Sequence, residues 1–307
     1  MRSARKIVAL LFLFPHFLFA QQQVVDSLQK ILASAKQDTN RASLLLRLLV
    51  TLRNSVPDKA LNYAREALSL SGKLNFTRGI GGAWLNIGNA NHVKGNYDSA
   101  IFFYRKAIPV YEKINNQKGL GKCYNGIGNA FNYQAKMDSA IGYFIQSLKI
   151  CETIHDTAGI TIAMVNIGNV YLYQSNFKKA KEFYGKAIAL GEAIHDEAIL
   201  SQTYNNLGAV SRYLGEFDRA YEDYKRSLAI RYKQGNKEGM AENLLNIGDV
   251  FFTTKQNDSA LVYFSRSLAI YTEIGHQKGM AYAMNDLASC FSAKKDLAKA
   301  IDFLNQT

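Results

Sequence analysis

The sequence predicts an all-α protein built as a solenoid of antiparallel helix hairpins, and two observations support this. The first is a repeat of forty residues: "LNIGNA" at residues 85–90 is followed by "NGIGNA", "VNIGNV", "NNLGAV", "LNIGDV" and "NDLASC". The second is composition, because the 307 residues are 48% hydrophobic and include only three prolines. Such a chain can bury a core with long helices, and a fixed period of this size is typical of a solenoid.

Several columns of residues stay in register when the chain is aligned in blocks of forty. A column of small residues contains Gly88, Gly128, Gly168, Gly208, Gly248 and Ala288. An alanine column contains Ala60, Ala100, Ala140, Ala180, Ala220, Ala260 and Ala300. An aromatic column contains Tyr104, Phe144, Tyr184, Tyr224 and Phe264, with Leu304 in the last place. Independent columns in register indicate a true structural repeat.

Each block predicts two helices joined by a turn. The first helix has apolar residues at helical spacing, as in Trp84 and Ile87, and the second has Ala100 and Tyr104. We expect Gly88 and Ala100 to face each other across the hairpin and to allow a close approach of about 8–10 Å between the helix axes. Tyr104 is expected to fill the space between this hairpin and the next.

The turns carry their own signals. An aspartate follows each turn within a hairpin and is expected to lie at the N-cap or in the first turn of the second helix, where it opposes the helix dipole; these residues are Asp98, Asp138, Asp218 and Asp258. The second helices end at "INN", "IHD", "QGN" or "IGH". Glycine, asparagine and histidine tolerate the left-handed conformation with which helices often end.

This pattern resembles the tetratricopeptide repeat. One repeat matches that family's residues in order and spacing, with Trp84, Ile87-Gly88, Ala100, Tyr104 and Ala107. The resemblance extends over about residues 39–307. The closing proline is missing, and the period is forty where the family usually has thirty-four, which longer helices would explain. The resemblance implies a right-handed superhelical solenoid whose first helices line a concave groove, and it says little about function.

The ends of the chain predict separate segments. Residues 21–38 are expected to form a capping helix with Val25, Leu28, Ile31 and Leu32 on one stripe. The solenoid then covers residues 39–307, with a degenerate first repeat. Its expected repeats are residues 39–78, 79–118, 119–158, 159–198, 199–238, 239–278 and an incomplete 279–307. Because Ile301 and Leu304 would lack a next layer, we expect a continuation beyond Thr307, which would be membrane-anchored.

Residues 1–20 predict a secretory signal peptide. Arg2, Arg5 and Lys6 precede fourteen uncharged residues, and the small residue Ala20 marks the expected cleavage site. The alternative is a retained membrane anchor, although the apolar run is shorter than the roughly 20 residues that span a bilayer. The protein is therefore expected to be exported to the bacterial periplasm or the outer face of the inner membrane.

A polar face on the first helices is the candidate binding site. With the repeat glycine as position eight, asparagine recurs at positions six and nine and tyrosine at position thirteen, which share one helix face. The candidate residues are Asn86, Asn89, Asn129, Tyr133, Asn166, Asn169, Tyr173, Asn206, Tyr213 and Asn246. Asparagine amides suit the backbone of an extended peptide, and tyrosine adds flat apolar area with a polar tip. Alternatively, asparagines bond one another between neighbouring helices and set the curvature.

Other chemistries have little support in the sequence. No phosphate-binding loop, nucleophile elbow or HExxH motif occurs, so we expect no enzyme, no cofactor and no metal site. His155 and His195 occupy the same joint in adjacent repeats and are interpreted as turn residues. A disulfide between Cys123 and Cys151 is geometrically feasible. The net charge is +12, or +9 without the first twenty residues. Most lysines and arginines lie on the expected second helices and turns, where they alternate with acidic residues. This distribution disfavours nucleic acid as a partner.

Together these observations predict a non-catalytic scaffold that binds an extended peptide or protein segment. The layout is similar to the extracytoplasmic repeat region of bacterial sensor proteins, which implies a role as the sensory or interaction part of a larger signalling protein. The alternative is a free-standing periplasmic scaffold or assembly factor.

Overall fold

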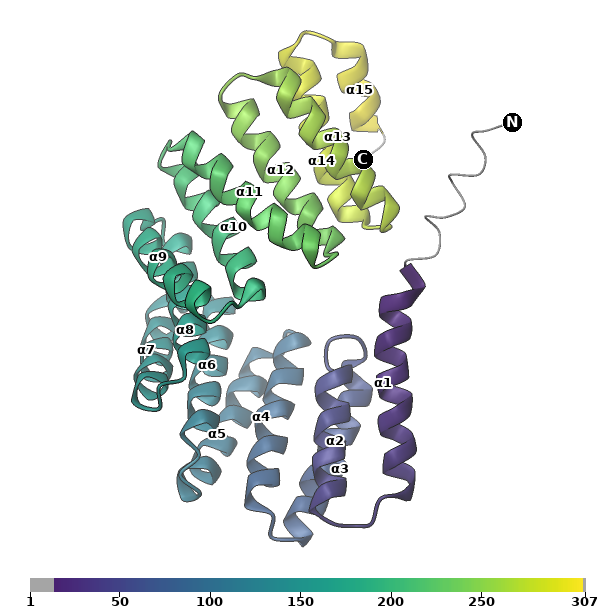
Figure 1. Ribbon diagram of the computed structural model, residues 1–307, viewed down its shortest axis with the longest axis vertical. Coiled ribbons are helices and arrows are strands. Elements are labelled where there is room, and N and C mark those ends of the chain that lie inside the picture. Colours follow the sequence, from purple (N-terminus) through teal and green to yellow (C-terminus); the bar gives the residue numbers. More distant parts are fainter. Residues whose placement is uncertain (1–13, 306–307) are drawn as a thin grey trace, which may run out of the picture. The chain divides into compact units, whose positions relative to one another are not determined.

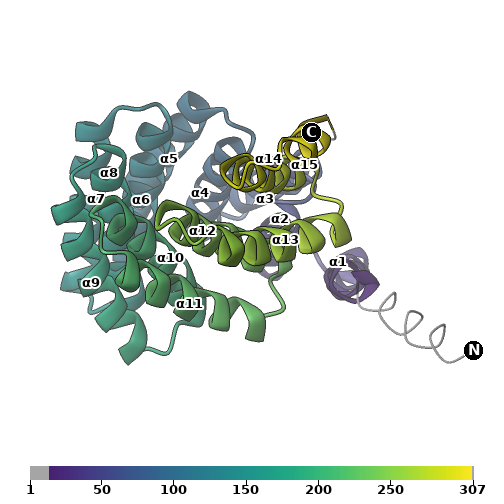
Figure 2. The same ribbon diagram turned by 90° about the horizontal axis from the view of Figure 1, so that it is seen from above.

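The computed structural model describes the backbone of residues 14–305 and the side chains of residues 22–305, and in this part it contains fifteen α-helices. The chain divides into two compact units, and the division falls between His155 and Asp156. Figure 1 shows the helices following one another in chain order as hairpins, and Figure 2 shows the same pairs from above. The prediction of an all-α hairpin solenoid is confirmed.

Unit 1 contains one leading helix and three hairpins. The leading helix is α1 (Phe14–Ser34). The hairpins are α2 (Thr39–Leu52) with α3 (Pro57–Lys73), α4 (Thr77–Val93) with α5 (Tyr97–Lys113), and α6 (Gln117–Tyr133) with α7 (Met137–Thr153). The predicted signal peptide, residues 1–20, lies outside the described side chains. Within α1, Val25, Leu28 and Leu32 are buried against the first hairpin, whereas Ile31 is 49% exposed.

Unit 2 contains four hairpins. They are α8 (Thr157–Tyr173) with α9 (Phe177–Ala193), α10 (Glu197–Tyr213) with α11 (Phe217–Lys233), α12 (Lys237–Thr253) with α13 (Asn257–Glu273), and α14 (Gln277–Ala293) with α15 (Leu297–Asn305). Helices α3 to α14 all have 17 residues. Two such helices and two short turns produce the forty-residue period, as the prediction of longer helices required.

The turns contain left-handed residues, and those at the ends of second helices are of the expected types. Between hairpins these are Asn75, Asn115, His155, His195, Gly235 and Gly275, and within hairpins they are Gly95, Ala135, Ser175, Gly215, Lys255 and Lys295. Their φ angles lie between 51° and 78°. The aspartates Asp98, Asp138, Asp218 and Asp258 lie in the first turns of second helices, as predicted. The first helices other than α4 instead begin at a capping side chain, such as Asn116, which accepts a hydrogen bond from the Gly119 amide.

The repeat glycines make room for the aromatic column. A Cβ atom on Gly88 would lie 2.6 Å from the ring of Tyr104, and one on Gly126 of the next hairpin would also lie 2.6 Å from that ring. The prediction that Tyr104 fills the space between its hairpin and the next is therefore confirmed, and Gly88 faces the second helix of its hairpin at this ring. Tyr104 is 1% exposed, and burial of such a side chain stabilises the fold by about 2–3 kcal/mol. One ring thus packs against two successive first helices.

Candidate functional site: the first-helix face

The candidate residues lie on first helices, which neighbour one another within each unit. Helix α4 contacts both α2 and α6, and α10 contacts both α8 and α12. No contact between successive second helices is recorded for the described residues, so each unit curves toward its first helices. We call the exposed side of α4 and α6 the first-helix face of unit 1, and that of α8, α10 and α12 the first-helix face of unit 2. Asn86, Asn89, Asn129 and Tyr133 belong to unit 1, and the other six candidate residues belong to unit 2.

Two of the asparagines at position nine accept hydrogen bonds from buried tyrosines. The Tyr104 hydroxyl donates to Asn89 Oδ1 at 2.9 Å, and the Tyr184 hydroxyl donates to Asn169 Oδ1 at 2.7 Å. A buried hydroxyl without a partner costs about 1–3 kcal/mol. Asn89 and Asn169 therefore stabilise the core in addition to lying on the candidate face.

Other candidate asparagines bond to asparagines of the neighbouring first helix. Asn206 Nδ2 donates to Asn169 Oδ1 at 2.9 Å, and Asn246 Nδ2 donates to Asn205 Oδ1 at 2.9 Å. These contacts agree with the structural alternative, in which asparagines link successive helices. Asn206 Oδ1 and Asn169 Nδ2 make no hydrogen bond within the described part of the chain. Asn206 therefore has an acceptor oxygen, and Asn169 a donor N–H group, that can bond to a ligand.

The remaining asparagines differ in their local contacts. Asn86 Nδ2 donates to the Gly82 carbonyl at 2.9 Å, and Asn86 Oδ1 accepts from Asn89 at 3.4 Å. Asn166 is half-buried and has an interaction partner. Asn129 is half-buried, and the aromatic residue of its hairpin, Phe144, has no hydroxyl to donate. The seven candidate asparagines thus do not form one uniform ladder.

The position-thirteen tyrosines are exposed and held by neighbouring rings. Tyr133 is 63% exposed, and its ring stacks on Tyr97 with a centroid distance of 5.3 Å. Tyr213 is 58% exposed and stacks on Phe177 at 5.0 Å, while the guanidinium of Arg212 lies 5.0 Å from the Tyr213 ring. Tyr173 is 67% exposed. Large apolar surface is therefore presented in a fixed geometry at two of the three positions.

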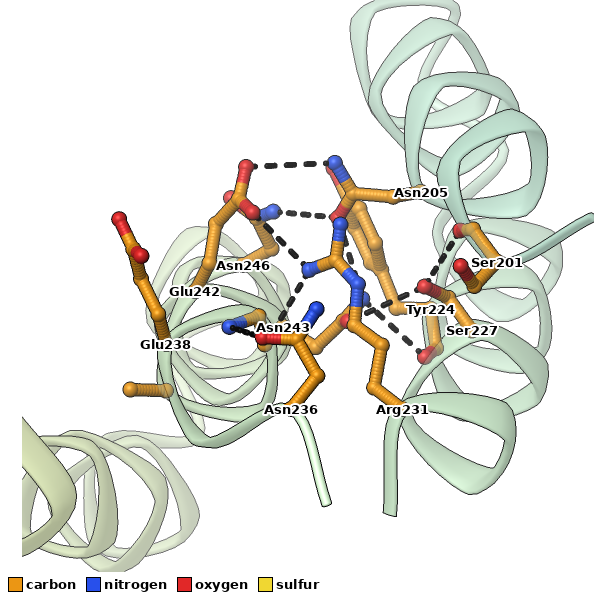
Figure 3. A network of polar contacts seen from close by, with 12 residues as sticks. Ser201, Asn205, Tyr224, Ser227, Arg231, Asn236, Glu238, Glu242, Asn243 and Asn246 are labelled. Carbon is orange, nitrogen blue, oxygen red and sulfur yellow. Dashed lines mark hydrogen bonds and ion pairs between the residues drawn. The ribbon is translucent and has the colours of Figure 1, made fainter. Parts of the chain in front are cut away.

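A buried polar network, which the sequence did not predict, lies behind the face in unit 2. Figure 3 shows Arg231 pointing toward Glu242 on α12, and Arg231 Nη1 donates to Glu242 Oε2 at 2.9 Å and to the Gly239 carbonyl at 2.7 Å. Asn243 is fully buried; its Nδ2 donates to Asn205 Oδ1 at 3.0 Å, and its Oδ1 accepts from Ser227 at 3.0 Å.

Two residues of this network stand out when the repeats are aligned in blocks of forty. Asn243 replaces Ala83, Cys123, Ala163, Thr203 and Ala283 of the other repeats, and Arg231 replaces Tyr111 and Tyr271. Polar residues in otherwise small or aromatic core columns need hydrogen-bond partners from neighbouring elements. Because each hydrogen bond joins residues of two columns, neither column alone predicts it.

Two carboxylates occupy the corresponding polar positions further along unit 2. Asp249 on α12 and Asp286 on α14 take the positions at which Asn169 and Asn206 bond each other. Burial, and next the charge of Asp249, raise the pKa of Asp286 to about 7. Burial also raises the pKa of Asp249, against the opposing effect of the Arg212 charge. An asparagine pair is thus replaced by a pair of acids that disfavours two simultaneous charges.

A cavity of about 440 Å³ opens at the N-terminal turns of α2, α4 and α6 in unit 1. Its charged lining residues are Arg78, Lys118 and Lys122, and no acidic residue lines it. Leu46, Phe76, Leu85 and Tyr111 provide apolar lining, and Asn86 and Asn116 provide amides. Arg78 and Lys118 lie just before the assumed start of the repeats and were therefore missed as site residues.

The described residues contain no group of three or more histidine, cysteine or acidic side chains that could hold a metal ion. His155 and His195 are left-handed turn residues, as interpreted. Cys123, Cys151 and Cys290 are buried and none of these three described residues is in a disulfide, so the feasible Cys123–Cys151 pairing is not formed. Burial raises the pKa of the Cys123 thiol to about 12. Among the described helices none is long and apolar enough to cross a bilayer.

The tetratricopeptide repeat family matches the chain at residues 79–153, 121–193, 159–233, 199–273 and 239–307. These segments cover most of the chain, so the protein belongs to the tetratricopeptide repeat family. Members of this family are repeat scaffolds and usually non-catalytic. No curated protein matches the sequence.

Solved structures with the same fold come from diverse proteins. BtubC from P. vanneervenii has 18% identity and a TM-score of 0.61, with 73% of this chain and 91% of that chain covered. The tetratricopeptide repeat sensor of a signal transduction ATPase with numerous domains, from Pyrococcus horikoshii, has 16% identity and a TM-score of 0.74. That match covers 91% of this chain and 42% of the other, so this chain spans less than half of that protein's length.

A Rap protein in complex with Competence and Sporulation Factor has 13% identity and a TM-score of 0.62, with 90% and 80% of the two chains covered. At these identities the likeness establishes the fold alone.

Proposed function

We propose that this protein is a non-catalytic scaffold that binds an extended peptide, or an unfolded segment of a partner protein, on the first-helix face of each unit. The observation that carries the proposal is the exposed tyrosines, which are Tyr133 in unit 1 and Tyr173 and Tyr213 in unit 2. Rigid, exposed aromatic rings supply much of the affinity in protein recognition, because they bury large apolar areas at a small entropic cost.

The amide groups left over from the asparagine contacts support the same proposal. Asn169 keeps a donor and Asn206 keeps an acceptor, and this pair matches the alternating N–H and C=O groups of an extended backbone. These contacts are made to the peptide backbone, so they provide affinity without sequence selectivity. The tyrosines add selectivity for apolar side chains of the peptide.

A related fold with a bound factor gives further support. The Rap structure contains Competence and Sporulation Factor, and another similar structure is described as a sensor. We propose that this chain is likewise the sensory or interaction part of a larger, exported signalling protein. A free-standing periplasmic scaffold is the second candidate, and the charged and apolar pattern of residues 1–20 favours export in both cases.

Binding is tested with a random peptide library displayed on phage and selected against the full chain. Tyr133→Ala with Tyr173→Ala and Tyr213→Ala should weaken binding of a selected peptide by at least about 100-fold, since the loss of one aromatic hot spot alone costs about 2 kcal/mol or more, a factor of about 30. The matched control is Tyr232→Ala with Phe102→Ala, which removes rings that are 72% and 54% exposed on second helices. Equal loss in both variants would contradict the proposal.

Export is tested separately by fusing alkaline phosphatase to residue 307 in a bacterial host. Activity of this enzyme requires the oxidising periplasm, so the fusion should be active and its Arg2→Glu/Arg5→Glu/Lys6→Glu version inactive. Intact mass of the native protein from the cell envelope distinguishes a larger signalling protein from a chain of residues 21–307.

A further inference from the structure

We propose that the stacked rings of Tyr97 and Tyr133 in unit 1 form a subsite for a basic side chain, so that the bound peptide carries lysine or arginine at this point. This inference rests on the proposed function and names the chemistry of the partner. Tyr133 ends α6, and its ring stacks on Tyr97, the first residue of α5, with a centroid distance of 5.3 Å. The side chain of Tyr133 is 63% exposed, so its ring offers surface to a ligand.

The corresponding pair of rings in unit 2 already holds a cation. Tyr213 stacks on Phe177 at 5.0 Å. These two residues lie eighty positions, or two repeats, after Tyr133 and Tyr97. The guanidinium of Arg212 lies 5.0 Å from the centre of the Tyr213 ring, where the ring quadrupole attracts a positive charge. No lysine or arginine is recorded over Tyr97 or Tyr133 in the described part of the chain.

The residues around the two ring pairs differ in charge. In unit 1 these residues are His92, Asp98, Asn132 and Gln134. The aligned residues in unit 2 are Leu172, Lys178, Arg212 and Leu214. Unit 2 therefore supplies two cations from its own chain, whereas unit 1 has a carboxylate and two amides at the matching positions. The cation that completes the ring pair in unit 1 is left to a ligand.

The carboxylate of Asp98 is fixed beside the rings of unit 1. Gln134 Nε2 donates to Asp98 Oδ1 at 2.8 Å, which joins the residue after Tyr133 to the residue after Tyr97. Asp98 is exposed and forms no salt bridge among the described residues. A basic side chain on the Tyr133 ring would thus lie beside a carboxylate that has no counter-charge.

Unpaired acceptors and helix ends also favour a cationic donor. The oxygens Asn132 Oδ1 and Gln134 Oε1 are buried and have no hydrogen-bond partner within the described residues. An unpaired buried acceptor destabilises the protein, and a ligand N–H group can reach it when the half-buried side chain turns outward. Helices α4 and α6 end here, at Val93 and Tyr133, and the negative end of a helix dipole attracts a cation.

The basic residues at the ends of α4 and α6 do not replace the ligand. Burial lowers the pKa of His92, so that its ring is mainly neutral at pH 7. Lys94 forms an ion pair with Asp58. Lys136 lies over the ring of Phe131 at 5.7 Å. The rings of Tyr97 and Tyr133 therefore remain without a cation of their own.

The test makes unit 1 resemble unit 2. The peptide-library selection is run on full-length protein with Tyr173→Ala/Tyr213→Ala, which we call the parent, so that Tyr133 is the remaining candidate tyrosine. It is run in parallel on the parent with Asp98→Lys/Asn132→Arg, which we call the filled variant. Because the net charge of +12 disfavours basic peptides in general, enrichment of lysine or arginine indicates a specific subsite.

The matched control is the parent with Asp218→Lys/Ser292→Arg. It introduces the same residues at the same repeat positions, where the first helices have Thr253 and Ala293 in place of the exposed tyrosine. We expect lysine and arginine to be enriched in peptides selected by the parent and by the control, and not in those selected by the filled variant.

Affinities then give the size of the effect. A selected basic peptide should bind the filled variant about tenfold more weakly than the parent, and its version with methionine for the basic residue should bind both equally. In the parent, Tyr133→Phe should retain most of the affinity and Tyr133→Leu should not, because only an aromatic ring attracts the cation. Circular dichroism shows whether the filled variant is folded, and Asp98→Asn, which should weaken binding about threefold, tests the carboxylate without an added charge.

The outcomes separate the two proposals. Enrichment of basic residues that persists in the filled variant, or that is absent from the parent selection, overturns the subsite. Equal loss of affinity in the filled variant and in the control also overturns it, because added charge alone would then be responsible. If the wild-type chain still selects peptides that depend on Tyr133, Tyr173 and Tyr213, the proposed function remains. If the wild-type chain selects no peptide, the proposed function fails and the subsite fails with it.

Discussion

The N-terminal turns of the first helices differ in charge between the two units. Unit 1 has Arg78, Lys118 and Lys122 around an open cavity. At the matching positions of unit 2, α8 and α10 have uncharged residues, α12 has Glu238 and Glu242, and α14 has Lys278. Glu242 is paired with Arg231 at 2.9 Å, and Glu238 lies 3.7 Å from His276. The buried alanine and aromatic columns are the same in both units. Packing therefore fixes the inner columns, and the exposed columns remain free to acquire function.

The polar contacts between successive first helices also differ. In unit 1, position six of α6 is Gly126, which lies against the Tyr104 ring. In unit 2 the same position on α10 is Asn206, which bonds to Asn169. One repeat architecture thus joins its helices through a buried ring in one place and through an amide pair in another. The following experiments test this comparison, beginning with the largest expected effect.

Exchanging the two position-six residues should be harmful in both units. Gly126→Asn places a Cβ about 2.6 Å from the Tyr104 ring, and such overpacking should lower the free energy of unfolding by about 2–3 kcal/mol. Asn206→Gly should cost about 1.5–2 kcal/mol through the lost hydrogen bond and the flexibility of glycine. Urea unfolding followed by circular dichroism measures both. Unchanged stability of Gly126→Asn would mean that the ring does not require the glycine.

Removal of position-nine asparagines should depend on the aromatic partner in the hairpin. Asn169→Ala leaves the buried Tyr184 hydroxyl without its acceptor and should cost about 1–3 kcal/mol. Asn129→Ala, opposite Phe144, should cost less than about 0.5 kcal/mol. The control is Asn169→Ala in the Tyr184→Phe background, where much of the penalty should vanish. Equal losses for Asn129→Ala and Asn169→Ala would remove the proposed difference.

The acidic pair should make stability depend on pH. Because the folded-state pKa of Asp286 is about 7 and its ordinary value is 3.8, the folded protein keeps a proton that the unfolded chain releases above about pH 4. The contribution of Asp286 to stability is therefore present below pH 4 and is lost as the pH rises to 7. Asp286→Asn should raise the free energy of unfolding by about 1–2 kcal/mol at pH 8, after allowance for solvent screening.

That measurement is made by urea unfolding at pH 5 and at pH 8. The wild-type protein at the same two pH values serves as the control. An Asp286→Asn protein with the same pH dependence as wild type would show that burial and the charge of Asp249 do not raise the pKa of Asp286.

The smallest effects should be equal in the two units. Ala135 in unit 1 and Lys255 in unit 2 have φ angles of 58° and 62° in their turns. Replacing either with glycine should stabilise the protein by about 0.5–1 kcal/mol, because glycine adopts this conformation without strain. Ala189→Gly, inside α9, should instead destabilise it by about 1 kcal/mol. Thermal unfolding followed by circular dichroism distinguishes these signs, and a loss of stability in Ala135→Gly would contradict the turn geometry.

The sequence determined the architecture through its period. Residues such as Ala100 and Tyr104 recur every forty positions, and each repeat buries them in the same way, so local pattern and global packing agree. The sequence also predicted where second helices end, because Asn75, His155 and Gly235 lie in left-handed turns that few residue types tolerate without strain.

Only the tertiary structure decided which polar residues are committed to the fold. Asn89 and Asn129 look equivalent in sequence, but a hydroxyl from another helix reaches the first and not the second. Arg78 and Lys122 are 44 residues apart and come together only because α4 and α6 pack side by side. A repeat period specifies contacts that are the same in every repeat, whereas cavities and polar networks arise where neighbouring repeats differ, and those pairings exist only after the chain has folded.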